Sequence, residues 1–312
     1  MSLRIQRIMT IGTPYRLLAL SWQSTLIDSQ VDNTRRDALN TTAHFQLRRF
    51  LARIGLLCVS GFIFLVVWTL VSLFVTHVRG APFPGPLETI ASFYRLLTNR
   101  ETIYQQTIWI HIRHSMGRWL LGYSIAIVLG VAMGAFLGSV KTAHAVFMPL
   151  VYTLQLIPGI AWIPIALLLF GLGNPSTVFM VSMVAVSPII INTATGIRST
   201  PQRYLWAARM MGAGRVRIFF EIVIPASVLS ILSGLRIGLA NAWRVLVAAE
   251  MIVGTGIGLG YIIIESRWSL NFKDAFVCIM IICLIGLTVE KVIFGAIEKW
   301  AMRTMGFSRE EP

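Results

Sequence analysis

The chain has 312 residues, of which 56% are apolar and only 13% are charged, and its formal net charge is +14. So few charged residues cannot cover the surface of a water-soluble protein, and they also exclude a disordered chain, which would be polar and rich in charge. The composition predicts an all-α, polytopic membrane protein whose Lys and Arg mark the cytoplasmic side, rather than a nucleic-acid-binding protein.

The first segment, residues 1–53, is polar and contains eight Arg and no Lys. Its short apolar patch is too brief to span a bilayer and no cleavage site follows it, so we expect a cytoplasmic N-terminal tail without a signal peptide. Six apolar segments of about the 20 residues that a bilayer requires come next. The predicted spans are 54–76, 119–138, 145–170, 176–195, 226–253 and 275–294.

The distribution of positive charge predicts the orientation of these spans. With an even number of spans, both termini lie on one side, and the segments on that side, together with Lys291 at the end of the last span, hold 18 of the 27 Lys and Arg. We therefore expect both termini, including the short tail 301–312, in the cytoplasm, and a membrane domain over 54–300.

The segment 77–118 is then extracytoplasmic. A proline-rich turn at 82–86 precedes a short helix with one apolar stripe, formed by Leu87, Ile90, Ala91, Tyr94 and Leu97. The stripe fits a helix that lies at the outer membrane face, and equally a loop helix packed on the bundle.

His111 and His114 follow at i, i+3. Because no third ligand is evident, a wet interfacial face is favoured over a metal site.

Small residues and prolines interrupt the spans. Gly130, Gly134 and Gly138 form two G-x-x-x-G steps in the second span, and Gly234 and Gly238 form one in the fifth, which predicts close helix packing. Pro158 in the third span indicates a kink, or a backbone segment opened onto a pathway.

The segment 198–225 is the most specific feature of the sequence. Pro201 can start a short basic helix that runs to Met211, and Gly212 and Gly214 can end it. This pattern predicts a compact cytoplasmic loop that a partner could grip; a plain positively charged loop that only sets orientation is the alternative.

The same segment resembles the cytoplasmic coupling motif of bacterial ABC importer permeases, which reads Glu-Ala-Ala, three residues, Gly, and then Ile-x-Leu-Pro. The matching residues are Ala207, Ala208, Gly212, Ile222 and Pro225. Trp206 replaces the glutamate and Ile224 replaces the leucine, so a substitution at Trp206 is expected to be milder than one at Gly212. Residues 156–173, 232–250 and 255–261 resemble the nitrate/sulfonate/taurine/bicarbonate-type group of this family.

The resemblance implies the MetI-like fold of type I importer permeases, in a multi-pass protein of the bacterial inner membrane. It also implies a second permease subunit, a pair of cytoplasmic ATPase subunits and an extracytoplasmic solute-binding protein. ATP and Mg²⁺ would be bound by the ATPase, so this chain is expected to hold no cofactor and no metal and not to be an enzyme. No phosphate-binding G-x-x-x-x-G-K-[ST] loop occurs in the sequence.

Charged residues within the spans are candidates for the translocation pathway of a small anionic or zwitterionic solute, such as nitrate, a sulfonate, taurine or bicarbonate. Arg236, Arg244 and Glu250 lie in the fifth span, and Pro158 and Trp162 in the third. For the arginines, pairing with an acidic residue of another helix is favoured over a solute contact. An ion-coupled secondary transporter, a membrane enzyme and an assembly subunit are the rival functions.

Overall fold

The computed structural model describes residues 52, 55–80, 82–254 and 256–304. The predicted tail 1–53, apart from residue 52, and residues 305–312 lie outside the described part. Two compact units make up the chain, Met1–Val71 and Ser72–Pro312. Across the described residues the structure is helical, and its one strand-like feature is an isolated bridge between Ile103 and Gln106. The prediction of an all-α protein is therefore confirmed.

Five helices among the described residues are long and apolar enough to cross a membrane. The first three are Gly55–Arg79, α4 (Ile108–Ser139) and α7 (Asn174–Arg198). The fourth, Arg215–Val253, joins α9 (Arg215–Ile218), the π-helical η2 (Phe219–Val223) and α10 (Ile224–Val253). The fifth, Phe272–Arg303, joins α12 (Phe272–Leu287), the π-helical η3 (Thr288–Phe294) and most of α13 (Gly295–Thr304).

The predicted third span, 145–170, is not one kinked helix. It consists of α5 (Lys141–Gln155) and a second piece, η1 (Gly159–Trp162) with α6 (Ile163–Phe170), and the two pieces are bent by 104°. Pro158 is the N-cap of η1. Proline has no N–H and disfavours helical geometry at the preceding residue, so the helix ends there. The count of six spans holds if this bent pair is one of them.

The second span also differs from its prediction, because α4 begins at Ile108 rather than at residue 119. The predicted segment 77–118 is therefore shorter than expected, and Arg113 and Arg118 lie inside a membrane-length helix. The hydropathy pattern placed them in a loop because it treats charged residues as solvated. Arg118 is instead buried, with 6% of its surface exposed.

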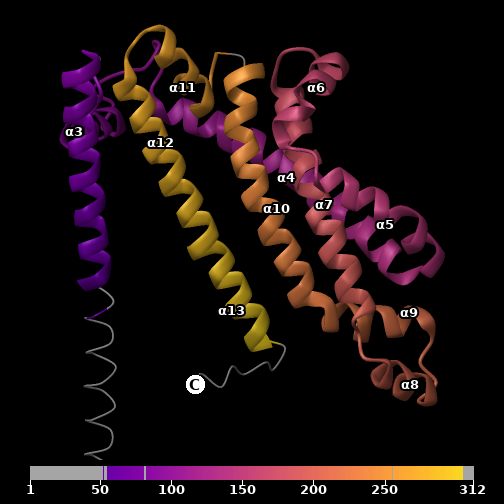
Figure 1. The fold of residues 1–312 in the computed structure, drawn as a ribbon. Coiled ribbons are helices and arrows are strands. Elements are labelled where there is room, and N and C mark those ends of the chain that lie inside the picture. Colours follow the sequence, from indigo (N-terminus) through magenta and orange to yellow (C-terminus); the bar gives the residue numbers. More distant parts are fainter. Residues whose placement is uncertain (1–51, 53–54, 81, 255, 305–312) are drawn as a thin grey trace, which may run out of the picture. The chain divides into compact units, whose positions relative to one another are not determined.

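The core of the second unit is α7, which packs against both α4 and α10 (Figure 1). A Cβ built on Gly134 of α4 would lie 2.6 Å from Cβ of Thr193, and one on Gly234 of α10 would lie 2.7 Å from Cβ of Asn192. Such distances leave room only for glycine, so the predicted close packing is confirmed. The same close approach to α7 occurs at Gly122, Gly130, Gly138 and Gly238.

The short helix predicted after the proline-rich turn is α3, Pro86–Leu97, and it packs on α12. Its buried residues include Thr89, Ser92 and Leu96, whereas Leu87 of the predicted apolar stripe is 84% exposed and Tyr94 is 59% exposed. The helix therefore contacts the bundle through Leu96 as well as through small polar residues, and most of the predicted apolar stripe is exposed. α11, Leu259–Trp268, follows α10 after a glycine-rich turn.

Candidate functional site

The segment 198–225 folds as a compact projection around the short helix α8, Gln202–Met210, beyond the C-terminal end of α7 (Figure 1). Gly212 adopts a positive φ of 80°, the N–H of Gly212 bonds to O of Arg209, and the N–H of Ala213 bonds to O of Ala208. These two bonds form a Schellman motif, which satisfies the last carbonyls of a helix and needs a left-handed residue. Gly212 therefore sets where α8 ends and how the chain turns.

A small apolar cluster fixes this projection to the spans. Ala208 is 1% exposed and packs with Ile197 at the end of α7, with Ile218 of α9 and with Val223 of η2. Ile222 and Ile224 are half-buried against the same cluster, whereas Trp206, Ala207 and Pro225 are exposed. The structure thus brings Ala208, Ile222 and Ile224 together and leaves Trp206 on the outside.

Arg244 lines an open hollow of about 340 Å³ where the bent pair meets α10. Gln155, Ile157 and Gly159 come from the break between α5 and η1, and Asn241 stands one turn before Arg244 on α10. The guanidinium bonds only to Oδ1 of Asn241, at 3.5 Å, and no ion pair to it is present among the described residues. One cation and two amide side chains therefore face an open cavity.

Pro158 and Trp162 have different relations to this hollow. Pro158 lies between two residues that line it, Ile157 and Gly159, and Gly159 packs directly against Val245. Trp162 is 8% exposed and packs edge-on against Phe179, with ring centroids 6.2 Å apart. Trp162 is thus part of the core and does not line the hollow.

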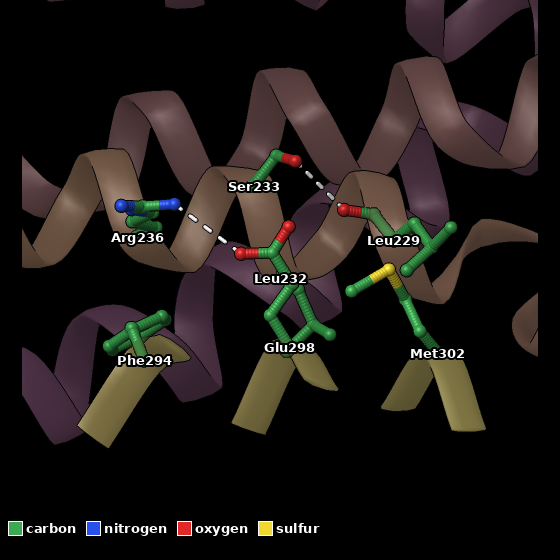
Figure 2. A pocket seen from close by; sticks show the side chains of 7 residues that line it. All are labelled: Leu229, Leu232, Ser233, Arg236, Phe294, Glu298 and Met302. Atoms are coloured by element: carbon green, nitrogen blue, oxygen red, sulfur yellow. Dashed lines mark hydrogen bonds and ion pairs between the residues drawn. The ribbon is translucent and has the colours of Figure 1, made fainter. Parts of the chain in front are cut away.

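Arg236 is paired with two carboxylates on a neighbouring helical segment. Its guanidinium lies 3.5 Å from Oε1 of Glu290 and 3.4 Å from Oε2 of Glu298. Figure 2 shows Arg236 and Glu298 facing each other across a hollow of about 250 Å³ between α10 and α13. Leu229, Leu232 and Ser233 complete the α10 side, and Phe294 and Met302 the other. Arg236 therefore links α10 to η3 and α13, which agrees with the expectation that it pairs with acidic residues of another helix.

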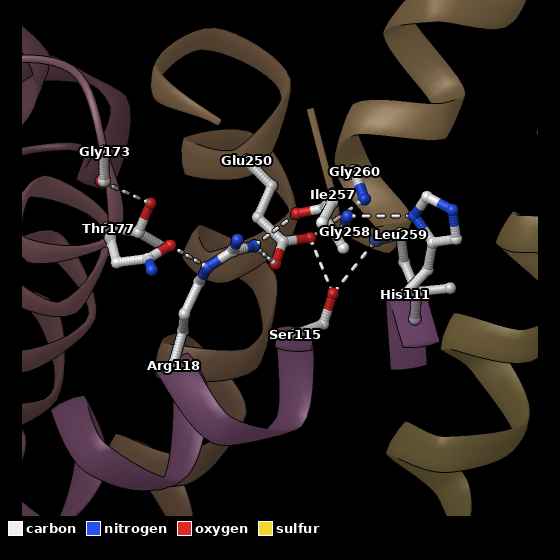
Figure 3. A network of polar contacts seen from close by, with 11 residues as sticks. His111, Ser115, Arg118, Gly173, Thr177, Glu250, Ile257, Gly258, Leu259 and Gly260 are labelled. Atoms are coloured by element: carbon white, nitrogen blue, oxygen red, sulfur yellow. Dashed lines mark hydrogen bonds and ion pairs between the residues drawn. The ribbon is translucent and has the colours of Figure 1, made fainter. Parts of the chain in front are cut away.

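Glu250 is the centre of a buried polar network (Figure 3). Its Oε1 accepts a hydrogen bond of 2.7 Å from Arg118 of α4, and its Oε2 accepts bonds from the hydroxyl of Ser115 and the N–H of Gly260. Arg118 also donates to Oδ1 of Asn174 and to O of Ile257, each at 2.7 Å. Both charges are thus neutralised and hydrogen-bonded, the condition under which a buried ion pair persists.

The network ties the glycine-rich turn after α10 to α4. The N–H of Leu259 bonds to the Ser115 hydroxyl, and the N–H of Gly258 bonds to Nδ1 of His111. His111 is fully buried, so the expectation of a wet interfacial face is wrong for this residue. His114 is exposed and lines another hollow, so the two histidines do not share a ligand. No three candidate metal ligands gather within the described ranges.

Arg118, Ser115 and His111 are not among the predicted site residues, although the sequence carries a signal for them. His111, Ser115 and Arg118 are spaced i, i+4, i+7, which places three polar side chains on one face of α4. A polar stripe of this kind indicates a buried polar contact. Its partner, Glu250, is 132 residues away from Arg118 in the sequence and cannot be found by local spacing.

The comparisons with known proteins agree with this architecture. Residues 126–303 match the family described as "Binding-protein-dependent transport system inner membrane component". The chain belongs to this family. It is 32% identical to the nitrate import permease protein NrtB of Synechocystis over 74% of this chain and 83% of that one. It is 30% identical to the bicarbonate transport system permease protein CmpB of Synechococcus elongatus over 78% and 87% of the two chains. A putative ABC transporter permease of Methanocaldococcus jannaschii is 34% identical over 72% and 83%.

A solved structure shows the same fold. The MetNI methionine ABC transporter in an inward-facing conformation superimposes with a TM-score of 0.52 and 16% sequence identity, covering 64% of this chain and 99% of that one. This permease is therefore a multi-pass inner-membrane component of a binding-protein-dependent ABC importer. It is a transporter component rather than a catalytic subunit, and systems of this kind include an ATPase and a binding protein. The rival reading as an ion-coupled secondary transporter is not favoured.

Proposed function

We propose that this permease carries a small anion of the nitrate, bicarbonate or sulfonate/taurine class into the cell, and that Arg244 is the cation that the solute meets on its way. The observation that carries this proposal is the difference between the two arginines of α10. Arg236 is paired with Glu290 and Glu298, whereas Arg244 has no ion-pair partner within the described residues. The names of the relatives, which include nitrate and bicarbonate permeases, support the solute class.

The chemistry of the Arg244 hollow suits a small anion. An arginine at the centre of a membrane helix costs about 2.5–3.5 kcal/mol even by the most lenient insertion scale, so one without a carboxylate needs water or an anionic ligand. Asn241 and Gln155 add amide donors beside the guanidinium. No carboxylate lines this hollow to compete with the solute.

The proposal also includes the complete assembly. Two permease subunits pair across the pathway, and each presents its segment 198–225 to one of two cytoplasmic ATPase subunits. These subunits bind ATP and Mg²⁺ and hydrolyse the ATP. The binding protein delivers the solute at the opposite face, near the start of α7. Both termini are then cytoplasmic, which accords with the excess of Lys and Arg on that side.

The test is a substitution that removes the positive charge of Arg244. We expect Arg244→Gln to lower the rate of anion uptake in proteoliposomes by about 10- to 100-fold, the effect of losing one charge-assisted hydrogen bond of about 1.5–3 kcal/mol. Assembly with the ATPase should be unchanged, because Arg244 makes no ion pair that holds the fold. Arg244→Lys should keep part of the transport. Uptake by Arg244→Gln at the wild-type rate would exclude Arg244 as the solute contact.

A further inference from the structure

An open hollow of about 420 Å³ lies between the first part of α4 and the start of α7. Four of its lining side chains carry nitrogen donors, namely Arg113, His114, Arg118 and Asn174. No carboxylate lines it. We call this site the Arg113 hollow. Its composition indicates an anionic ligand.

Arg113 is the uncompensated cation of this hollow. It is exposed, and it makes no ion pair and no hydrogen bond within the described ranges. Arg118 is instead neutralised by Glu250, and its Nε donates to Oδ1 of Asn174 at 2.7 Å. That bond occupies the acceptor of Asn174 and leaves its amide NH₂ group free to donate. A guanidinium, an imidazole and an amide can therefore share one anion.

The polar end of the hollow lies at the level of lipid headgroups. α4 has 32 residues and is about 48 Å long, whereas the hydrocarbon core of a bilayer is about 30 Å thick. Trp109, in the first turn of α4, is 51% exposed, and its indole N–H donates to O of Leu97. Half-exposed tryptophans of this kind mark the membrane interface. Arg113 follows one turn later, just below this level.

The deeper end of the hollow is apolar. It is lined by Gly117 and Leu121 of α4 and by Val178 of α7. Leu121 lies about 12 Å beyond Arg113 along the helix axis and is 56% exposed. The hollow therefore changes from cationic to apolar with increasing depth in the membrane. A small soluble anion needs only the first part, whereas a lipid with an anionic headgroup matches both.

The hollow is separate from the one around Arg244. The two share no lining residue. On α7, Val178 lines the Arg113 hollow and Val184 lines the Arg244 hollow, and six residues place them about 120° apart around the helix. The two hollows thus open on different sides of α7, and an anion in the Arg113 hollow does not lie on a direct path to Arg244.

The direction of the helices decides which leaflet the hollow faces. A Cβ on Gly122 would approach Val181, and one on Gly138 would approach Ile197, so α4 and α7 run in the same direction. Both helices begin beside the hollow, which is therefore at the opposite end of α7 from segment 198–225. With that segment in the cytoplasm, the hollow faces the outer leaflet.

We propose that the Arg113 hollow binds an anionic phospholipid of the outer leaflet. The phosphate accepts hydrogen bonds from Arg113, His114 and the amide of Asn174, and an acyl chain lies along Leu121 and Val178. Only the choice of leaflet rests on the proposed function; the site itself does not depend on the transported solute.

The test measures lipid binding to the full-length permease, purified in detergent and freed of bound lipid, by native mass spectrometry. The probes are dioleoylphosphatidylglycerol and dioleoylphosphatidylcholine, which differ only in the headgroup. We expect the wild type to bind the anionic lipid about 10-fold more tightly, the effect of one charge-assisted hydrogen bond. Arg113→Gln should reduce this preference to about twofold or less. The matched control is Arg267→Gln, because Arg267 is also exposed and lies on α11, outside the hollow.

A second variant tests the hollow without changing its charge. A Cβ on Gly117 would meet no atom within 4 Å, so Gly117→Leu should fill the hollow without a clash in the fold. It should remove the preference for the anionic lipid as Arg113→Gln does. Unchanged melting temperatures of both variants in lipid-free detergent would show that the loss does not come from misfolding.

Three results would overturn the inference. They are a wild type with no preference for the anionic lipid, an equal loss of preference in Arg267→Gln, and displacement of the bound lipid by millimolar nitrate, bicarbonate or phosphate, which would assign the hollow to a soluble anion. Arg244→Gln should keep the lipid preference while it loses anion uptake. Failure of the lipid site and failure of the proposed function are thus distinguishable.

Discussion

Glu250→Gln is expected to lower the free energy of unfolding of this permease by about 3–5 kcal/mol, the usual loss when one partner of a buried ion pair is removed. The variant leaves the Arg118 guanidinium buried, with 6% of its side chain exposed and no carboxylate beside it. It also weakens the acceptor of the Ser115 hydroxyl and of the Gly260 N–H. The measurement is thermal or denaturant unfolding of the purified subunit in detergent.

Two variants make this prediction specific. Removing both charges, in Arg118→Gln with Glu250→Gln, should recover part of the loss, because no uncompensated charge stays buried. The control is Glu88→Gln, since Glu88 pairs with Lys273 at 3.7 Å and both side chains are about half exposed. That pair should contribute less than about 1 kcal/mol. Equal losses for Glu250→Gln and Glu88→Gln would show that the network around Glu250 does not stabilise the fold.

Gly212→Val is expected to leave the subunit in the membrane but to abolish its purification with the ATPase. A Cβ at Gly212 would meet no atom within 4 Å, so the whole cost comes from the backbone at φ 80°. A left-handed conformation costs an ordinary residue about 1–2 kcal/mol, and a β-branched one more. The Schellman bonds of Gly212 and Ala213 would then open, and α8 would lose its fixed position.

The neighbouring glycine provides the matched control for this effect. Gly214 also has no atom within 4 Å of a built Cβ, but its φ is −69°, which any residue adopts. Gly214→Val should therefore bind the ATPase better than Gly212→Val, and Gly212→Asn should be intermediate because asparagine tolerates the left-handed region. Affinity for the ATPase, measured for the three variants, decides. If Gly214→Val does not bind the ATPase better than Gly212→Val, or if Gly212→Asn is not intermediate, the left-handed conformation of Gly212 does not control ATPase binding.

The spans, the glycine contacts and the end of α8 could be predicted from the sequence because each depends on neighbouring residues. Runs of apolar residues predict spans, G-x-x-x-G predicts close approach, and Gly212 after a short helix predicts a left-handed turn. The start of α4 could not be predicted in this way. Arg118 is tolerated inside a membrane-length helix only because Glu250, from a distant part of the sequence, neutralises it.

The break at Pro158 and the isolation of Arg244 are also products of tertiary structure. A proline in a membrane helix can give a mild kink or a complete break. Here the bend is 104°, and Gly159 at the break lies directly against Val245 of α10. In the same way, Arg236 and Arg244 look alike in the sequence. Only the structure shows that Glu290 and Glu298 reach Arg236, while Arg244 faces an open hollow.

The most direct test of the central proposal is uptake of labelled nitrate and bicarbonate by proteoliposomes that contain the permease, its co-purified ATPase and the binding protein. ATP is supplied on the side of the ATPase, and the anion with its binding protein on the other. We expect accumulation of one of these anions, or of a sulfonate in a parallel assay, that requires both ATP and the binding protein. Accumulation driven by an ion gradient without ATP, or ATP-dependent transport that excludes every anion of this class, would contradict the proposal.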